Sequence, residues 1–285
     1  MGTDTVAGLG VRRWSGRTDD GPVVLALHGL TATSAVWDDL ARRTPLPVVA
    51  PDLPGRGASV AAPAGPGLTG LAEAVLDVVD ALGLQRVVVV GHSMGAFLAP
   101  LVTDGLGSRA VGTVLLDGGA PPARSLLHRP FVVRALLGLQ LRRLVRAWTS
   151  VDAYTAAAEG RLVVERPDLR DGVRAWSEAV LRPHGGALRP ALDPARVVAD
   201  GVDSLCRPAH LPLLRRATTP VHLLAASHGA DGRRAPFLSD EAVTDAVRLV
   251  PRLGWQRVPA THASLLFDAA VAAAVRRVAD GGGTG

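Results

Sequence analysis

Short, uninterrupted runs of hydrophobic residues recur along the chain, separated by segments whose hydrophobic residues repeat at the spacing of a helix. Continuous runs of this length are typical of parallel strands that helices cover on both faces. The alternation of the two patterns predicts a doubly wound α/β sheet with right-handed crossovers. The predicted strands lie at residues 22–28, 46–51, 86–92, 111–117, 220–226 and 255–260, and the clearest helical patterns lie at 71–82 and 263–280.

One region interrupts this alternation. Residues 121–210 contain no convincing strand and have the pattern of helices separated by proline and glycine. We therefore expect a core of residues 1–120 and 211–285, with 121–210 inserted as a helical lid. A hydrophobic stripe and an arginine-rich face share one helix of this segment, which favours a lid over a pocket rather than a helix on a membrane surface. The stripe comprises Leu137, Leu141, Leu144, Val145 and Trp148.

The composition excludes several classes of protein. No apolar run reaches the roughly 18 residues that a membrane span needs, so we expect no membrane-spanning helix. The N-terminus has no secretory pattern, and the single Cys206 permits no internal disulfide. Both features fit a reducing compartment, and we expect a cytoplasmic protein.

The positive charge of the chain does not indicate a nucleic-acid partner. The formal net charge is +5, and all 31 basic residues are arginine because the chain has no lysine. The chain also lacks asparagine and isoleucine, whose codons are AT-rich like those of lysine, so a GC-rich genome explains the arginine bias. No basic tail, RNA-binding signature or zinc-ligand spacing accompanies the charge, so neither nucleic acid nor a metal is an expected partner.

The stretch GHSMG, residues 91–95, follows a predicted buried strand and precedes a helical pattern. A serine between two glycines in that setting is the pattern of a nucleophile elbow, a sharp turn that projects the serine hydroxyl above the sheet. The turn is strained and leaves no room for a side chain at either glycine. We therefore predict that Ser93 is a nucleophile, whereas the plainer interpretation is a glycine-rich turn around an inert serine.

A serine nucleophile needs a base, and the base needs a carboxylate to orient it. His262 lies between the last predicted strand and the final helix, in a loop that can reach the carboxyl edge of the sheet. Asp117 ends the strand after the elbow helix and is the favoured acid. Asp231 follows the next predicted strand and is its rival, while Asp240 and Glu241 remain further alternatives.

Attack on a carbonyl group also needs donors for the negative charge that develops on its oxygen. The backbone amide of Met94, directly after the nucleophile, is one predicted donor. The amide of Leu30 is the other, because it lies where the chain leaves the predicted strand 22–28 at the same edge of the sheet.

Taken in order, these pieces resemble the α/β-hydrolase superfamily. The resemblance covers roughly residues 20–278 and implies an eight-stranded, mostly parallel sheet with a helical lid after the sixth strand. It implies a triad of Ser93, Asp117 or Asp231, and His262, with no metal or organic cofactor. Most members place the acid after the seventh strand, whereas polyketide-type thioesterases place it after the sixth, where Asp117 would be. The matching pieces are LHGLTATSAVW, APDLPGRGAS, VVVVGHSMGA, VLLDGG, TTPVHLLAA and VPATHASLL.

We therefore predict a serine hydrolase that cleaves a carboxylic ester, lactone or thioester of a small molecule through an acyl-enzyme. The predicted pocket is mainly apolar and includes Trp37, Trp148 and Trp176. The alternatives on the same fold are a carbon–carbon bond hydrolase, cofactor-free oxygen or peroxide chemistry, and a small-ligand receptor without catalysis. The sequence carries no prediction of the oligomeric state.

Overall fold

Four consecutive valines form the middle of the sheet. Val87 and Val89 pack into the hydrophobic cluster on one face. Val88 and Val90 pack into the cluster on the other face, and all four are 0% exposed. Successive side chains of a strand point to opposite faces, so a strand that is covered on both sides is hydrophobic throughout. The run therefore becomes a central parallel strand, β5 (Val87–His92).

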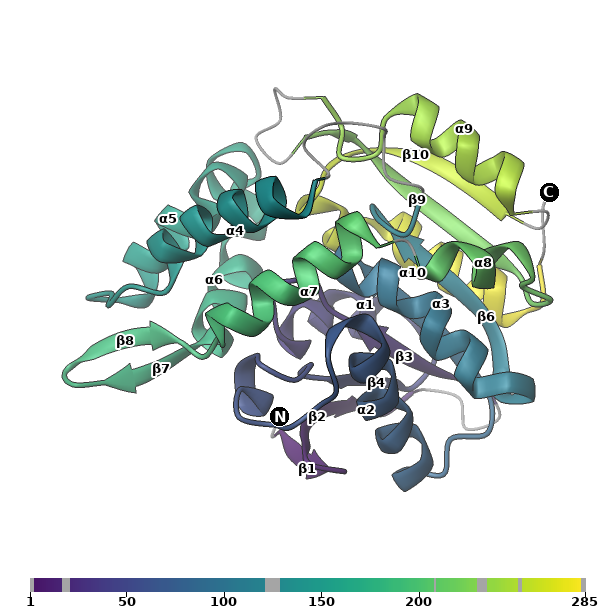
Figure 1. Cartoon of the computed structure of the whole chain (residues 1–285), viewed down its shortest axis with the longest axis horizontal. Helices are drawn as coiled ribbons and strands as arrows, with labels where there is room; N and C mark the ends of the chain where they lie inside the picture. The colour runs from purple at the N-terminus through teal and green to yellow at the C-terminus, as the bar shows by residue number, and fades with distance from the viewer. Residues whose placement is uncertain are drawn as a thin grey trace.

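The computed structural model describes residues 3–16, 21–120, 129–207, 209–229, 235–250 and 253–282. Its eight-stranded sheet has the order β1-β2-β4-β3-β5-β6-β9-β10 (Figure 1). β2 pairs with β1 and with β4 in antiparallel orientation, whereas the other neighbours are parallel. Besides β5, the strands are β1 (Asp4–Val6), β2 (Leu9–Trp14), β3 (Val23–Leu27), β4 (Val48–Pro51), β6 (Ala110–Leu116), β9 (Val221–His228) and β10 (Leu253–Thr261).

The predicted fold is confirmed, and a strand is present at each of the six predicted positions. β1 and β2 were not predicted, because neither is a continuous hydrophobic run. β1 is largely exposed, and β2 contains Arg12 and Arg13. Ala7 and Gly8, with φ of 47° and 80°, form the turn between these two strands.

Helices cover both faces of the sheet. α2, α3, α8 and α9 contribute to one hydrophobic cluster, and α1 and α10 contribute to the other. In the part of the chain that the structure describes, no helix is both long and hydrophobic enough to cross a bilayer. These helices are α1 (Asp38–Arg43), α2 (Gly67–Ala81), α3 (Met94–Leu106), α8 (His210–Arg215), α9 (Asp240–Leu249) and α10 (Ala269–Ala279).

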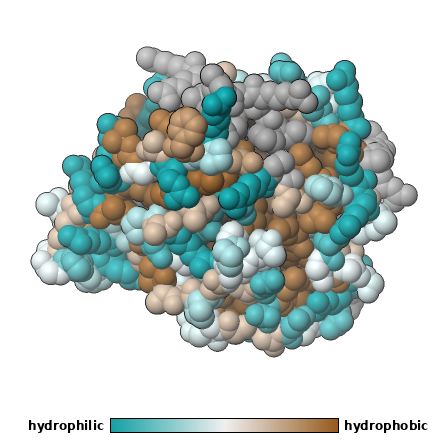
Figure 2. All heavy atoms as spheres, viewed as in Figure 1, coloured by the Kyte–Doolittle hydropathy of each residue, from teal (hydrophilic) through white to brown (hydrophobic). Residues whose placement is uncertain are grey.

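The segment between β6 and β9 is mainly helical. Figure 1 shows α4, α5 and α6 projecting beyond the sheet on one side of the molecule, with α7 between them and the core helices. Hydrophobic and hydrophilic residues both lie on the surface of this segment (Figure 2), and Phe131 of α4 is 67% exposed. Its helices are α4 (Pro130–Leu144), α5 (Val151–Glu165), α6 (Arg170–Val180) and α7 (Pro194–Cys206).

The inserted segment also contains an antiparallel hairpin, which corrects the expectation that residues 121–210 hold no strand. β7 (Leu181–His184) pairs with β8 (Ala187–Pro190). Gly185 and Gly186 connect them with φ of 55° and 79°. Two-residue hairpin turns favour a pair of such residues, so the Gly-Gly dipeptide was the available signal.

One buried ion pair joins the inserted segment to the core. Arg56, in the loop after β4, and Asp200, in α7, are 0% and 1% exposed and pair through Nη1 and Oδ2. Arg56 also donates from Nε to the carbonyl oxygen of Leu30 at 3.0 Å. Burial lowers the pKa of Arg56 and raises that of Asp200, because it removes both charges from water. The pair thereby fixes α7 against the loop that carries Leu30.

Replacing one member of this pair should destabilise the protein strongly. Arg56→Met leaves Asp200 buried without a cation, so we expect the free energy of unfolding to fall by about 3–5 kcal/mol in urea denaturation followed by circular dichroism. The double variant Arg56→Met with Asp200→Leu should recover much of this loss, because it removes both charges. Arg174→Met breaks an exposed pair with Asp152 and serves as the control, with a change below about 1 kcal/mol. Equal effects of the two single variants would contradict this account.

Candidate active site

Ser93 occupies a strained turn between β5 and α3. Its φ is 54°, a left-handed conformation that is uncommon for residues other than glycine. A Cβ added to Gly91 would lie 2.1 Å from the carbonyl oxygen of Gly95, and one added to Gly95 would lie 2.1 Å from that of Leu27. Both flanking positions therefore require glycine. Within the described part of the chain, the Ser93 side chain makes no hydrogen bond, and it lines a cavity.

The structure brings His262 and Asp117 together. Nδ1–H of His262 donates to Oδ2 of Asp117 at 2.7 Å. Asp117 follows β6, is 0% exposed, and also accepts a hydrogen bond from the amide of Ala226 at 3.1 Å. His262 follows β10 and lines the same cavity as Ser93. The imidazole is thus oriented by a buried carboxylate, which fixes its tautomer and leaves Nε2 as a proton acceptor.

The other predicted acids are not placed beside His262. Asp240 begins α9 and pairs with Arg257, and Glu241 is exposed on the same helix. Asp231 lies outside the described residues. Asp117 is therefore the carboxylate that the described structure places on His262.

His92 supports His262 in a way that sequence reasoning missed. The Nε2–H group of His92 donates to the carbonyl oxygen of His262 at 2.9 Å. The centroids of the two rings are 4.7 Å apart. Burial lowers the pKa of His92 to about 3, so its imidazole is neutral at physiological pH. A contact between residues this distant in sequence has no local signal.

The loop that carries Leu30 passes beside the nucleophile. A Cβ added to Gly29 would lie 3.4 Å from Cβ of Ser93. His28 holds this loop, since Nδ1–H donates to the Gly29 carbonyl oxygen at 2.8 Å and Nε2 accepts from the amide of Leu53 at 2.9 Å. Burial lowers the pKa of His28 to about 4, which keeps the imidazole neutral and able to accept.

Two backbone amides are available at this edge of the sheet. Met94 is the first residue of α3, so its amide has no partner within the helix and lies at the positive end of the helix dipole. The amide of Leu30 donates no hydrogen bond within the described residues. Both residues line the cavity of Ser93, so their amides are candidate donors to a carbonyl oxygen bound there.

The cavity of Ser93 has a volume of about 500 Å³ and mainly hydrophobic walls. An adjoining cavity of about 590 Å³ shares several lining residues with it, among them Gln140, Glu159 and Trp176. The inserted helices α4, α5 and α6 supply these three residues. Within the described residues, no group of three or more histidine, cysteine, aspartate or glutamate side chains could hold a metal ion.

The three predicted pocket tryptophans have different positions. Trp176 lines both cavities, and its ring stacks on Phe267 with centroids 4.6 Å apart. Trp37 is 0% exposed in the core beneath the sheet and lines neither cavity. Trp148 follows α4 rather than belonging to it and packs edge-on against Tyr154. The predicted pocket roles of Trp37 and Trp148 are thus corrected to packing.

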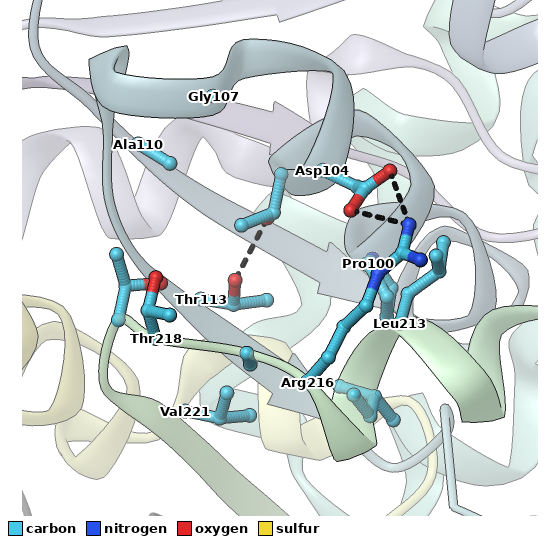
Figure 3. Close-up of a pocket in the computed structure, with 13 residues that line it drawn as sticks. Pro100, Asp104, Gly107, Ala110, Thr113, Leu213, Arg216, Thr218 and Val221 are labelled. Carbon is cyan, nitrogen blue, oxygen red and sulfur yellow. Dashed lines mark hydrogen bonds and ion pairs between the residues drawn. The ribbon is translucent and has the colours of Figure 1, made fainter.

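A smaller cavity of about 160 Å³ lies at the opposite end of the sheet, between the end of α3 and the start of β9 (Figure 3). Arg216 donates to both carboxylate oxygens of Asp104 at 3.0 Å across its rim. The described residues that line it include no serine, histidine or cysteine. Its described lining therefore offers threonine hydroxyls and a carboxylate, but no serine or cysteine nucleophile with a histidine base.

Comparisons with known proteins agree with this architecture. A model of the alpha/beta hydrolase family matches residues 23–275. The 2-(acetamidomethylene)succinate hydrolase of Mesorhizobium japonicum is 26% identical over 245 residues, which are 84% of this chain and 80% of that protein. Lipase LipV of Mycobacterium tuberculosis is 35% identical over 140 residues, 48% of each chain. The chain spans 27% of an uncharacterized protein of Mycobacterium bovis, to which it is 35% identical over 94 residues.

Solved structures share the fold over nearly the whole chain. The crystal structure of an E-2-(acetamidomethylene)succinate hydrolase superposes with a TM-score of 0.77 at 22% identity and covers 98% of both chains. The Mycobacterium tuberculosis esterase Rv0045c has a TM-score of 0.72 at 20% identity, with 98% of this chain and 91% of that chain covered. At these identities the likeness concerns the fold alone.

A side chain at the elbow glycines should prevent the turn from forming. Gly95→Ala places a methyl group against the Leu27 carbonyl oxygen, so we expect a loss of at least about 3 kcal/mol in the free energy of unfolding, or failure to fold. Gly138→Ala is the matched control, because Gly138 lies in α4 with nothing within 4 Å of the new methyl group. The control variant should have the free energy of unfolding of the wild type, or one up to about 1 kcal/mol higher. A Gly95→Ala variant as stable as the control would refute the proposed packing.

Proposed function

Because the chain belongs to the alpha/beta hydrolase family, we propose that it is a serine hydrolase that cleaves a carboxylic ester, lactone or thioester through an acyl-enzyme. One observation carries the proposal: His262 donates to the buried carboxylate of Asp117 and lines the same cavity as Ser93. Side chains from three distant segments thus lie around the carboxyl edge of the sheet, and this placement supports nucleophilic catalysis by serine.

In the first half of the reaction, Ser93 Oγ attacks the carbonyl carbon of the substrate and its proton passes to Nε2 of His262. The amides of Met94 and Leu30 stabilise the negative charge on the carbonyl oxygen. Collapse of the tetrahedral intermediate breaks the bond to the alcohol or thiol, which leaves with the proton from His262. The acyl group then remains as an ester of Ser93.

In the second half, water attacks the acyl-enzyme and gives a proton to His262. Collapse of the second intermediate returns this proton to Ser93 and releases the carboxylic acid. Asp117 remains a carboxylate throughout, because its role is to hold the imidazole and to stabilise its charged form. The two halves of the reaction need no reactant besides the substrate and water.

The walls of the cavity support a substrate with an apolar portion. Leu137 and Leu141 of α4 and Trp176 of α6 face the space around Ser93. Burial of apolar substrate surface against them stabilises the complex by about 25 cal/mol per Å². We assign residues 121–210 as the lid that sets the acyl preference. The similarity to a 2-(acetamidomethylene)succinate hydrolase over most of both chains makes that compound a second candidate substrate.

Labelling tests the nucleophile directly. A fluorophosphonate should modify Ser93, and Ser93→Ala and His262→Ala should lower hydrolysis of 4-nitrophenyl butyrate by at least about a thousandfold. Ser204→Ala is the matched control, because Ser204 lines the same cavity but its hydroxyl is bonded to the Asp200 carbonyl oxygen. A folded protein that takes no label and cleaves no activated ester would be a ligand receptor instead.

Two conservative variants test the acid. Asp117→Asn keeps the side-chain volume but removes the charge that stabilises the imidazolium of His262, so we expect kcat to fall by about 10⁴. Asp231→Asn should change kcat by less than about threefold. The measurement is the steady-state hydrolysis of the same activated ester, with circular dichroism to confirm folding. A much larger loss for Asp231→Asn would transfer the role of the acid to that residue.

A further inference from the structure

Glu159 is an acidic residue in the cavity that the proposed reaction does not use. It lies on α5, and it lines both the cavity of Ser93 and the adjoining cavity. The residue is partly buried. A carboxylate removed from bulk water is costly unless a cation or a hydrogen-bond donor compensates it. Its position between two cavities therefore suggests that the compensating group arrives with a ligand.

The protein itself supplies no such group. Within the described part of the chain, the Glu159 carboxyl group has neither a hydrogen bond nor an ion pair. Glu165, on the same helix, and Glu178, on α6, each pair with an arginine four residues away. Burial raises the pKa of Glu159 to about 7, although the nearby His262 lowers it. A raised pKa is expected of a carboxyl group whose charged form is not sufficiently stabilised by the groups around it.

The surroundings of Glu159 suit a cation that carries hydrocarbon groups. Trp176 lines the same two cavities, and its stacking on Phe267, with 14° between the ring planes, fixes its orientation. An aromatic ring attracts cations through its electron-rich face, and a carboxylate adds a full opposite charge. Gln140 also lines both cavities and adds a polar group without charge. Ammonium groups are recognised by this combination.

We propose that Glu159 binds an ammonium group of the substrate, so that the protein prefers esters that carry a positive charge in their acyl or alcohol portion. The inference rests on the proposed hydrolase function and specifies its substrate class. It also disfavours the second candidate substrate, because 2-(acetamidomethylene)succinate carries two carboxylates, which Glu159 repels. The neighbouring basic residue Arg143 lines only the adjoining cavity of the two.

Two esters of the same shape test the preference. The butyrate esters of choline and of 3,3-dimethylbutan-1-ol differ only in a quaternary nitrogen in place of a carbon atom. At pH 8, where Glu159 is mostly ionised, we expect kcat/KM to be at least about tenfold higher for the choline ester, because its cation gains ionic and cation–π attraction in a site partly removed from water. In Glu159→Gln, which keeps the side-chain size, the ratio should approach one.

The control is Glu165→Gln, the same substitution on the same helix at an exposed residue that pairs with Arg161. It should retain the wild-type ratio of the two esters. If Glu159→Gln keeps the preference, or if wild-type protein shows none, the inference is overturned. A preference lost in both variants would also overturn it, because the effect would then come from the net charge.

The same ratio gives a pH signature. Other groups that face Glu159 are His262, Tyr154 and Arg143. Burial raises the pKa of Tyr154, so its phenol stays neutral between pH 6 and 8. Glu159→Gln retains all three groups, so its ratio over the same pH range measures what they contribute. Since the charge on Glu159 is lost below a pKa of about 7, the preference should decline from pH 8 to pH 6. A ratio that is constant over this range would contradict the role of the carboxylate.

Binding separates this inference from the hydrolase proposal. By calorimetry at pH 8, choline should bind wild-type protein at least about tenfold more tightly than 3,3-dimethylbutan-1-ol, and Glu159→Gln should remove the difference. If this holds but Ser93 takes no label and no ester is cleaved, the ammonium site stands and the hydrolase proposal fails. If esters are cleaved through Ser93 but choline and the alcohol bind equally, the hydrolase proposal stands and the role of Glu159 is refuted.

Discussion

The register of β5 against β6 is the constraint on which the candidate site depends. Parallel pairing sets His92 opposite Leu116, so the residues that follow, Ser93 and Asp117, leave the sheet side by side at its carboxyl edge. The amide of Ser93 donates to the carbonyl oxygen of Leu116 at 2.9 Å and extends this pairing into the turn. A slip of one residue would turn every side chain of β5 to the opposite face and move Ser93 out of line with Asp117. The candidate site therefore depends on this register.

The loops around this edge are held by buried polar groups rather than by hydrophobic packing. Asp52 accepts from the amides of Ser34 at 2.7 Å and Ala58 at 2.8 Å, and His28 and His92 hold the neighbouring backbone. Burial keeps both imidazoles neutral, so the two residues act as fixed hydrogen-bonding groups across the physiological pH range. Such groups are costly without partners and specific with them. They explain how loops without regular structure keep a defined geometry.

The parts of the fold that could be predicted from the sequence are those with a local cause. Strands buried on both faces are hydrophobic throughout, and the GHSMG turn excludes side chains at both glycines, so both leave a readable pattern. β1 and β2 lie at the antiparallel edge and lack that pattern. The hydrogen bond from His92 to His262, the packing of Trp37 and the exposure of Glu159 to two cavities arise from tertiary contacts. Sequence spacing carries no trace of such contacts, although the Gly-Gly turn of the β7–β8 hairpin was a local signal.

The division between core and inserted segment also divides the chemistry. The sheet and its loops position Ser93, Asp117 and His262, whereas the inserted helices supply part of the wall of the cavity. Arg56 crosses this division: it donates to the carbonyl oxygen of Leu30, whose amide is a proposed oxyanion donor, and it pairs with Asp200 on α7. A buried guanidinium group with one partner in the core and another in α7 cannot move without losing one of them. The position of the inserted segment and the geometry of the loop that carries Leu30 are therefore coupled through one guanidinium group.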